Sequence, residues 1–130
     1  MQNERKPFFY DVTLRDGNQA LPKPWNNAEK EEVFKQLLKL GVQGVEVGFA
    51  AASEMDFESC KGIAKLTARM AEEGDEAASK VVVASLARCN AADIQRAWEA
   101  VQYAPHPRIQ TCLAISRLSM GHVLHMKAGQ

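Results

Sequence analysis

The sequence lacks several features that would place it in a specialised class. Its 130 residues carry 16 basic and 16 acidic side chains, so no charge excess favours a nucleic acid or an anionic membrane as partner. No apolar run approaches the roughly 20 residues that a membrane helix needs, and the first residues lead into no signal-peptide core. We therefore expect a cytoplasmic protein with no nucleic-acid and no membrane partner.

Cysteine is also scarce. Cys60, Cys89 and Cys112 are scattered, form no CxxC pair and leave one thiol over, which favours reduced cysteines without a disulfide framework. The glycines of residues 41–48 do not form a G-x-G-x-x-G motif, which argues against a dinucleotide-binding domain.

The sequence does contain an alternation of strand and helix patterns, repeated four times. The predicted strands are Phe8–Leu14, Val42–Phe49, Val81–Ala87 and Arg108–Ser116. Helices are predicted after Asn26, from Ser53 or Glu54 to Glu73, after Asn90 and from Ser119, with a polar loop at 74–79. The inward residues of the first and third helices are predicted to be Val33, Phe34, Leu37, Leu38, Leu40, Ile94, Ala97, Trp98 and Val101, with Lys30 on the polar face. Such alternation predicts one α/β domain over residues 1–130, with a parallel sheet and right-handed crossovers.

Two architectures fit this alternation. A doubly wound sheet normally has about five strands, and only four are found here. A TIM (β/α)8 barrel needs roughly 250 residues, of which this chain supplies about half. Four βα units alone leave two open sheet edges, so we expect either the remainder of a barrel or other copies of the chain as a homo-oligomer.

The most informative stretch is the end of the first predicted strand. Arg15, Asp16 and Gly17 place a cation, an anion and a flexible residue in succession, which suits a strand tip opening into a pocket. The connection from Asn18 to Asn26 exceeds the roughly 2–6 residues of most βα loops, and loops of that length are commonly functional. Without further information, an ordinary surface ion pair of Arg15 with Asp16 fits as well.

Asp11-Val-Thr-Leu-Arg-Asp-Gly17 with Gln19 resembles the signature of the DRE-TIM metallolyases. That superfamily includes 2-isopropylmalate synthase, homocitrate synthase, citramalate synthase and hydroxymethylglutaryl-CoA lyase. Three further stretches are similar to the ends of the family's second, third and fourth strands: Val45–Phe49, Leu86–Arg88 and Leu113–Ser116. Asn18–Trp25 favours the 2-isopropylmalate synthase branch. The resemblance implies a TIM barrel, of which these residues form the amino-terminal half.

The resemblance also implies an activity. Enzymes of this branch are acyltransferases of leucine biosynthesis that condense acetyl-CoA with a 2-oxo acid, with a divalent cation (Mg²⁺, Mn²⁺ or Zn²⁺) as Lewis acid. It implies Asp16 as a metal ligand and Arg15 and Glu46 as catalytic residues. The implied substrate-binding residues are Gly17, Gln19, Gly48, Arg88 and Ser116.

Some of these residues have simpler interpretations. Glu46 fits a strand carboxylate paired with a neighbouring Arg or Lys, and Arg88 fits a solvated helix cap. His122 and His125 stand three apart on a predicted helix and could ligate a metal, but the family's metal histidines come from a later His-x-His strand. The third predicted strand ends at Arg88 and not at a lone Asp, which argues against a phosphoacceptor receiver domain.

The sequence also departs from the family pattern. Gln110 and Ser119 stand where the family usually has histidine, and no His-x-His follows. Because one carboxylate cannot hold a divalent ion tightly, we expect these 130 residues to lack independent activity. The alternative is a shortened, non-catalytic relative that serves as a binding or assembly module.

Overall fold

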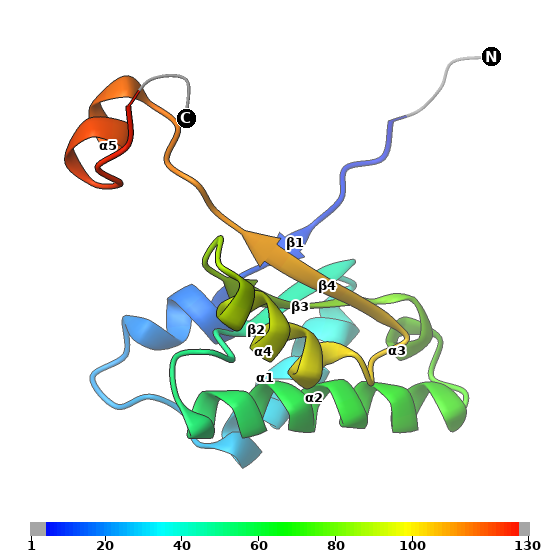
Figure 1. The fold of residues 1–130 in the computed structure, drawn as a ribbon. Coiled ribbons are helices and arrows are strands. Elements are labelled where there is room, and N and C mark those ends of the chain that lie inside the picture. Colours follow the sequence, from blue (N-terminus) through cyan, green and yellow to red (C-terminus); the bar gives the residue numbers. More distant parts are fainter. Residues whose placement is uncertain (1–4, 128–130) are drawn as a thin grey trace.

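A computed structural model describes residues 5–127 of the chain. In order, its elements are β1 (Tyr10–Asp11), η1 (Thr13–Gly17), α1 (Asn27–Leu40), β2 (Gly44–Gly48), α2 (Glu54–Glu72), α3 (Glu76–Lys80), β3 (Val82–Ala87), α4 (Ala91–Val101), β4 (His106–Thr111) and α5 (Arg117–His122). The four strands form one sheet, and α1, α2 and α4 lie on the same side of it (Figure 1). Helix α5 stands apart from this layer, beyond the end of β4. No helix within residues 5–127 has both the length and the apolar character to cross a bilayer.

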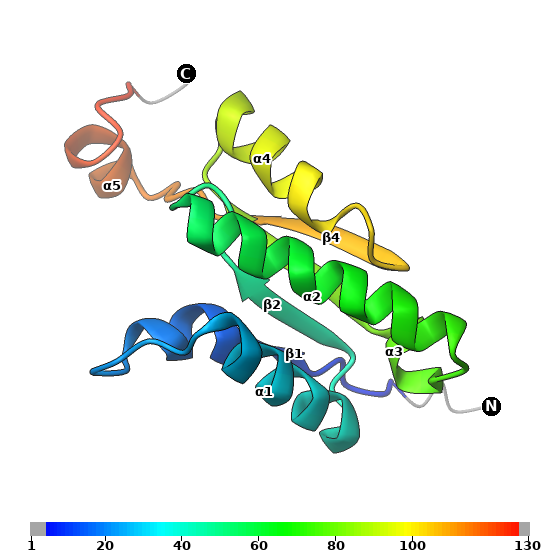
Figure 2. The same cartoon turned by 90° about the horizontal axis from the view of Figure 1, so that it is seen from below.

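The strand order distinguishes the two candidate architectures. All neighbouring strands are parallel, and their spatial order β1-β2-β3-β4 repeats the order along the chain. Figure 2 shows α1, α2 and α4 together in front of the strands. A doubly wound sheet reverses its strand order and carries helices on both faces, whereas a TIM barrel keeps the sequential order with its helices outside. The predicted fold class is confirmed: four parallel strands with alternating helices form one open sheet, consistent with part of a TIM barrel.

The core fills the space between the sheet and its helices. Val45 and Val47 of β2 and Phe34 of α1 have no exposed surface. Helix α2 adds a row of buried residues at helical spacing, namely Cys60, Ile63, Ala64 and Thr67. Every residue of β2 is buried, as expected of a strand covered on both faces within a parallel sheet. The site residue Glu46 therefore lies on the most completely buried of the four strands described.

The predicted helix ends are confirmed where capping residues mark them. Asn26 and Glu29 form a capping box at the start of α1, each side chain accepting from the other's backbone N–H, at 2.9 and 2.8 Å. Asn90 caps α4 and Ser53 caps α2 in the same way, through the side-chain oxygen. Gly41 ends α1 in the left-handed region, with φ of 88°.

Gly41→Ala is expected to lower the free energy of unfolding by about 1 kcal/mol, because a Cβ disfavours left-handed backbone. The matched control is Gly62→Ala inside α2, where an added Cβ meets nothing nearer than Glu31 Oε1 at 3.7 Å. Since alanine is the better helix former, this control should raise stability by about 0.5–1 kcal/mol. Urea denaturation measures the free energy of unfolding of both variants. A change of the same sign in the two would refute the role of Gly41 as a left-handed helix end.

The predicted first strand, Phe8–Leu14, is wrong in extent. Only the two residues of β1 pair with β2, and the two phenylalanines before them are exposed. The strand ends because the Asp11 carboxylate accepts hydrogen bonds from the Thr13 backbone N–H at 2.9 Å and from its hydroxyl at 3.0 Å. Such local side-chain bonds compete with strand pairing and favour a turn. The chain therefore coils into η1, a single π-helical turn, where a strand end was predicted.

Two other element predictions are also wrong. The segment 74–79 is not a loop throughout, because Asp75 accepts a hydrogen bond from the Ala78 N–H at 2.9 Å and caps the short helix α3. Strand β4, His106–Thr111, begins before Arg108 and ends before Ser116, the two limits that were predicted, and it includes Pro107. Proline is tolerated there because β4 is an edge strand of the sheet described.

The inward faces of two helices also differ from prediction. Three predicted core residues are exposed: Leu40, Ile94 and Trp98. In α4 the predicted core residues Ala97 and Val101 are confirmed as buried, and Ala100 is buried with them. The two small alanines let the helix lie close to the sheet. Lys30 was predicted on the polar face of α1 but is only 5% exposed.

Candidate active site

The turn η1 directs Arg15 back towards β2. The carbonyl of Val12 accepts hydrogen bonds from the backbone N–H groups of Arg15, Asp16 and Gly17, at 3.2, 2.9 and 3.2 Å. Leu14 is buried beneath the turn and anchors it in the core. Isolated π-helical turns are frequent at functional sites. The turn thus leaves the Arg15 side chain partly buried against Glu46 of β2 and the Asp16 side chain exposed.

Arg15 joins the first segment to the second strand. Its Nε donates to Glu46 Oε1 at 2.5 Å, and its Nη1 lies 3.1 Å from Asp16 Oδ1. The exposed fraction of the side chain is 22% for Arg15, 2% for Glu46 and 66% for Asp16. Burial of a carboxylate as deep as that of Glu46 is costly unless the group is paired, and Arg15 supplies the pairing cation. Glu46 was interpreted either as a strand carboxylate paired with a basic residue or as a catalytic residue. Both interpretations involve Arg15, because it is the basic residue that pairs with Glu46.

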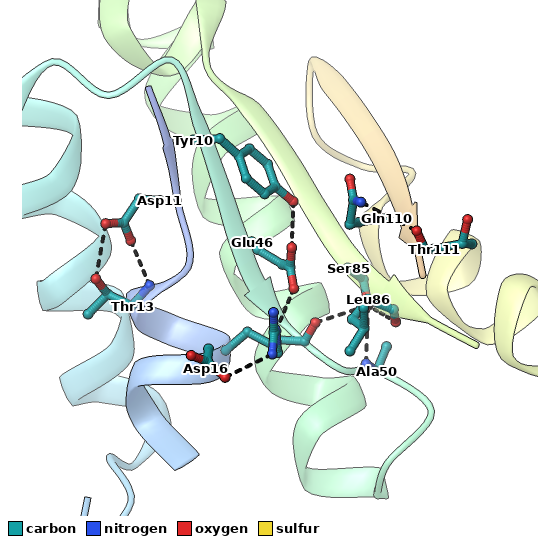
Figure 3. Close-up of polar contacts among 12 residues, drawn as sticks. Tyr10, Asp11, Thr13, Asp16, Glu46, Ala50, Ser85, Leu86, Gln110 and Thr111 are labelled. Atoms are coloured by element: carbon teal, nitrogen blue, oxygen red, sulfur yellow. Dashed lines mark hydrogen bonds and ion pairs between the residues drawn. The ribbon is translucent and has the colours of Figure 1, made fainter. Parts of the chain in front are cut away.

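Tyr10 completes the surroundings of Glu46. Its hydroxyl donates to Glu46 Oε2 at 2.8 Å (Figure 3). Burial, and after it the hydrogen bond and the charge of Glu46, raise the pKa of the Tyr10 phenol well above its ordinary value. The phenol is thus a neutral donor at physiological pH, and both oxygens of Glu46 carry a hydrogen bond.

A cavity of about 370 Å³ opens beside Arg15, lined also by Gln19, Gly48 and Lys30. The loop that carries Gln19 is closed by Asn18, whose side-chain oxygen accepts a hydrogen bond from the backbone N–H of Trp25 at 2.9 Å. The Lys30 ammonium lies 3.9 Å from Asp56, at the edge of ion-pair distance. Asp56 also lines the cavity, beside the two cationic side chains Arg15 and Lys30, and these two cations suit an anionic ligand such as a carboxylate.

Among the described residues, Asp16 is suited to be one ligand of a divalent cation. Asp16 offers an exposed carboxylate, an oxygen donor of the kind that hard cations prefer. Within residues 5–127, no group of three or more His, Cys, Asp or Glu side chains is placed to hold a metal ion. His122 and His125 therefore belong to no such group among the described residues. Asp16 can take part in a metal site but does not define one alone.

Comparisons with known proteins identify the family. A family model described as HMGL-like matches residues 6–130. The chain belongs to the HMGL-like family. It is 48% identical over 118 residues to 2-isopropylmalate synthase 2 of Leptospira interrogans, covering 91% of this chain and 25% of that relative. It is also 44% identical to 2-isopropylmalate synthase B of Solanum pennellii, over 94% of this chain and 19% of that relative. It is likewise 44% identical to 2-isopropylmalate synthase of Ruminiclostridium cellulolyticum, over 91% of this chain and 21% of that relative.

The HMGL-like chain therefore spans a quarter or less of the length of these curated relatives. The predicted family, DRE-TIM metallolyases with a relationship to 2-isopropylmalate synthases, is confirmed. What those names say of activity applies to the relatives.

Arg88 of this HMGL-like chain is engaged at the start of α4. Its Nε and Nη2 donate to the two oxygens of Asp93, at 2.7 and 3.0 Å, and its backbone N–H also donates to Oδ2 at 3.1 Å. The guanidinium lies 5.7 Å from the centroid of the Phe49 ring, a residue that also lines the cavity. This arrangement agrees with the helix-cap interpretation, and contact with a substrate stays a prediction.

The other predicted substrate residues lie in different surroundings. Ser116 is exposed and caps α5, accepting from the Ser119 N–H at 3.1 Å. An added Cβ at Gly17 would make only ordinary contact with Thr13, at 3.6 Å. At Gly48 it would lie 2.8 Å from the Cys60 sulfur, so α2 requires a glycine there. The structure brings Arg15, Gln19 and Gly48 to one cavity and does not bring Ser116 there.

The Arg88–Asp93 pair predicts a pH-dependent stability. The hydrogen bond from Arg88 is the largest cause that lowers the pKa of Asp93 in the folded chain. A lowered folded pKa contributes stability above the unfolded value, about 3.9, and that contribution is lost as pH falls through the folded pKa. Arg88→Met should therefore lower the urea midpoint at pH 7, and the difference from wild type should shrink towards pH 2. A difference that is constant over this range would rule the pair out as the cause.

Sequence reasoning missed two residues of the site, Tyr10 and Lys30. Tyr10 stands in the first strand with the pattern of a packing residue, and only the register of β1 on β2 brings its hydroxyl to Glu46. Lys30 stands among alternating charges that are typical of a solvated helix face. Helical spacing from the buried Phe34 is the one signal that could have revealed Lys30, since residues four apart share a face.

Proposed function

We propose that this chain forms the amino-terminal part of the active site of a 2-isopropylmalate synthase-like acyltransferase, which condenses acetyl-CoA with a short 2-oxo acid. The observation that carries the proposal is Arg15, held by the buried Glu46 at a cavity that Gln19 also lines. The names of the similar relatives support the same reaction class.

In this reaction the methyl carbon of acetyl-CoA loses a proton and attacks the ketone carbon of the 2-oxo acid, and the ketone oxygen takes up that charge. Water then cleaves the thioester, releasing coenzyme A and a carboxylate. Arg15 would place a fixed positive charge beside the developing oxyanion. Lys30, on the same cavity, would attract the carboxylate of the oxo acid. Both tasks require cations held in position before the substrate arrives, as Glu46 holds Arg15.

A divalent cation, when bound, would polarise the ketone as a Lewis acid, and Asp16 is the described residue that would hold it. Asp16 suits this role because its carboxylate is exposed and, among the described residues, makes a polar contact with Arg15 alone. The same contact would keep the Arg15 guanidinium next to the ketone oxygen.

Thiol release tests the proposal. The full natural polypeptide that carries this sequence is incubated with acetyl-CoA, 2-oxoisovalerate and Mg²⁺ or Mn²⁺, and free coenzyme A is followed with a chromogenic disulfide. The expected result is thiol release that depends on the oxo acid. Absence of release with every short 2-oxo acid tested would refute the proposal.

Gln110 and Ser119, where the family resemblance leads one to expect histidines, favour a second candidate: a non-catalytic relative that binds the oxo acid without turning it over. Gln110 lies on β4 and its side chain donates to the Thr111 carbonyl at 3.4 Å. Binding of 2-oxoisovalerate in calorimetry, with no thiol release in the assay above, would favour this second candidate.

A further inference from the structure

We propose that Tyr10 is a positioning residue: its hydroxyl orients the buried Glu46, which in turn holds the Arg15 guanidinium at the cavity. The consequence for catalysis rests on the proposed function, whereas the contacts themselves do not.

The Glu46 carboxylate is held from two sides. Tyr10 donates to Oε2 at 2.8 Å from β1, and Arg15 donates to Oε1 at 2.5 Å from η1. Among the described residues, no other donor reaches Oε2. Because Glu46 is 2% exposed, removal of the Tyr10 hydroxyl would leave this oxygen without protein or bulk-water partner. With one donor left, the carboxylate could rotate and loosen its bond to Arg15.

The neighbourhood of Tyr10 is shaped for this contact. Tyr10 is the register partner of Gly44 on β2, and a Cβ at Gly44 would lie 2.7 Å from Tyr10 Cδ2 and 3.1 Å from Phe8 Cε1. The tyrosine ring therefore lies against bare backbone, where any side chain would displace it. From that place its hydroxyl reaches Glu46, two residues further along β2. A phenylalanine would fill the same space without the donor.

The effect on Arg15 follows from how its nitrogens are used. Nε is bonded to Glu46 and Nη1 to Asp16, and these two bonds set the plane of the guanidinium. No contact within residues 5–127 engages Nη2, which leaves that donor for an anion in the cavity that Arg15 lines. Tyr10 therefore controls the orientation of Arg15 Nη2 and not the charge of the guanidinium.

The test compares Tyr10→Phe with Tyr103→Phe, the chain's other tyrosine, which is 43% exposed and whose ring lies beside Lys61 and Lys65 of α2. In protein labelled with ¹⁵N-arginine, we expect Tyr10→Phe to speed exchange of the Arg15 Nε–H with water about fivefold, the factor that a hydrogen bond of ordinary strength represents. Tyr103→Phe should leave it unchanged. An equal Arg15 exchange rate in wild type and folded Tyr10→Phe would overturn the proposal.

If Tyr10→Phe does not fold, the wild-type protein with ¹³C at the tyrosine Cζ supplies the second measurement. The pKa of Tyr10 should lie above the ordinary tyrosine value, so its Cζ signal should stay that of a neutral phenol through that value, and a titration midpoint at about 10 would overturn the contact. Thiol release separates this inference from the proposed function. Faster Arg15 exchange in Tyr10→Phe, with an inactive wild type, refutes the function alone. An active wild type, with Arg15 exchange and kcat unchanged in Tyr10→Phe, refutes the positioning role alone.

Discussion

Arg15→Lys is expected to lower the rate of thiol release about 100-fold, the usual effect of removing one donor from an oxyanion site. A lysine carries its charge on a single nitrogen, so it cannot contact Glu46 through one nitrogen and Asp16 through a second while presenting a third. Steady-state kinetics of thiol release in the full natural polypeptide measures the effect, which we expect in kcat more than in KM.

The matched control for this prediction is Arg69→Lys, in which the arginine is exposed near the end of α2. It makes the same chemical change away from the cavity and should leave kcat within a factor of two or so, as surface changes usually do. Wild-type kcat in Arg15→Lys would mean that the guanidinium geometry plays no part in the reaction.

Glu46→Ala is expected to have the largest effect on stability, a loss of about 2–4 kcal/mol in the free energy of unfolding. The change leaves the Tyr10 hydroxyl and the partly buried Arg15 guanidinium without their acceptor, and unpaired buried donors and charges are costly. The part of Arg15 that reaches solvent keeps the loss below that of a fully buried pair. Urea denaturation at pH 7 measures it.

Two variants make this second prediction specific. Glu58→Ala removes an exposed glutamate of α2 and should change stability by about 0.5 kcal/mol or less. Glu46→Gln keeps the size of the side chain and one acceptor oxygen, so its loss should fall between those of the two alanine variants. Equal losses in Glu46→Ala and Glu58→Ala would show that the buried carboxylate does not stabilise the fold.

Local patterns were enough to predict most of the fold. Helix ends are encoded by neighbouring residues, which is why Asn26 and Gly41 identify the limits of α1. The alternation of strand and helix predicts parallel pairing because a crossover helix returns the chain to the end of the sheet at which the previous strand began. The first strand was predicted too long because the two hydrogen bonds that Thr13 donates to the Asp11 carboxylate outweigh the strand propensity of the segment.

The sequence by itself determined the order of the elements, the family motif and the residues Arg15, Asp16 and Glu46 as candidates. The tertiary structure decided that all three large helices cover one face of a sequentially ordered sheet, and that Tyr10 and Arg15 meet on Glu46. The physical reason is separation along the chain. These partners stand 36 and 31 residues from Glu46, and only the register of β1 on β2 and the coil of η1 bring them together. Lys30 follows the same rule, since its burial depends on how α1 meets α2 and not on the charges beside it in the sequence.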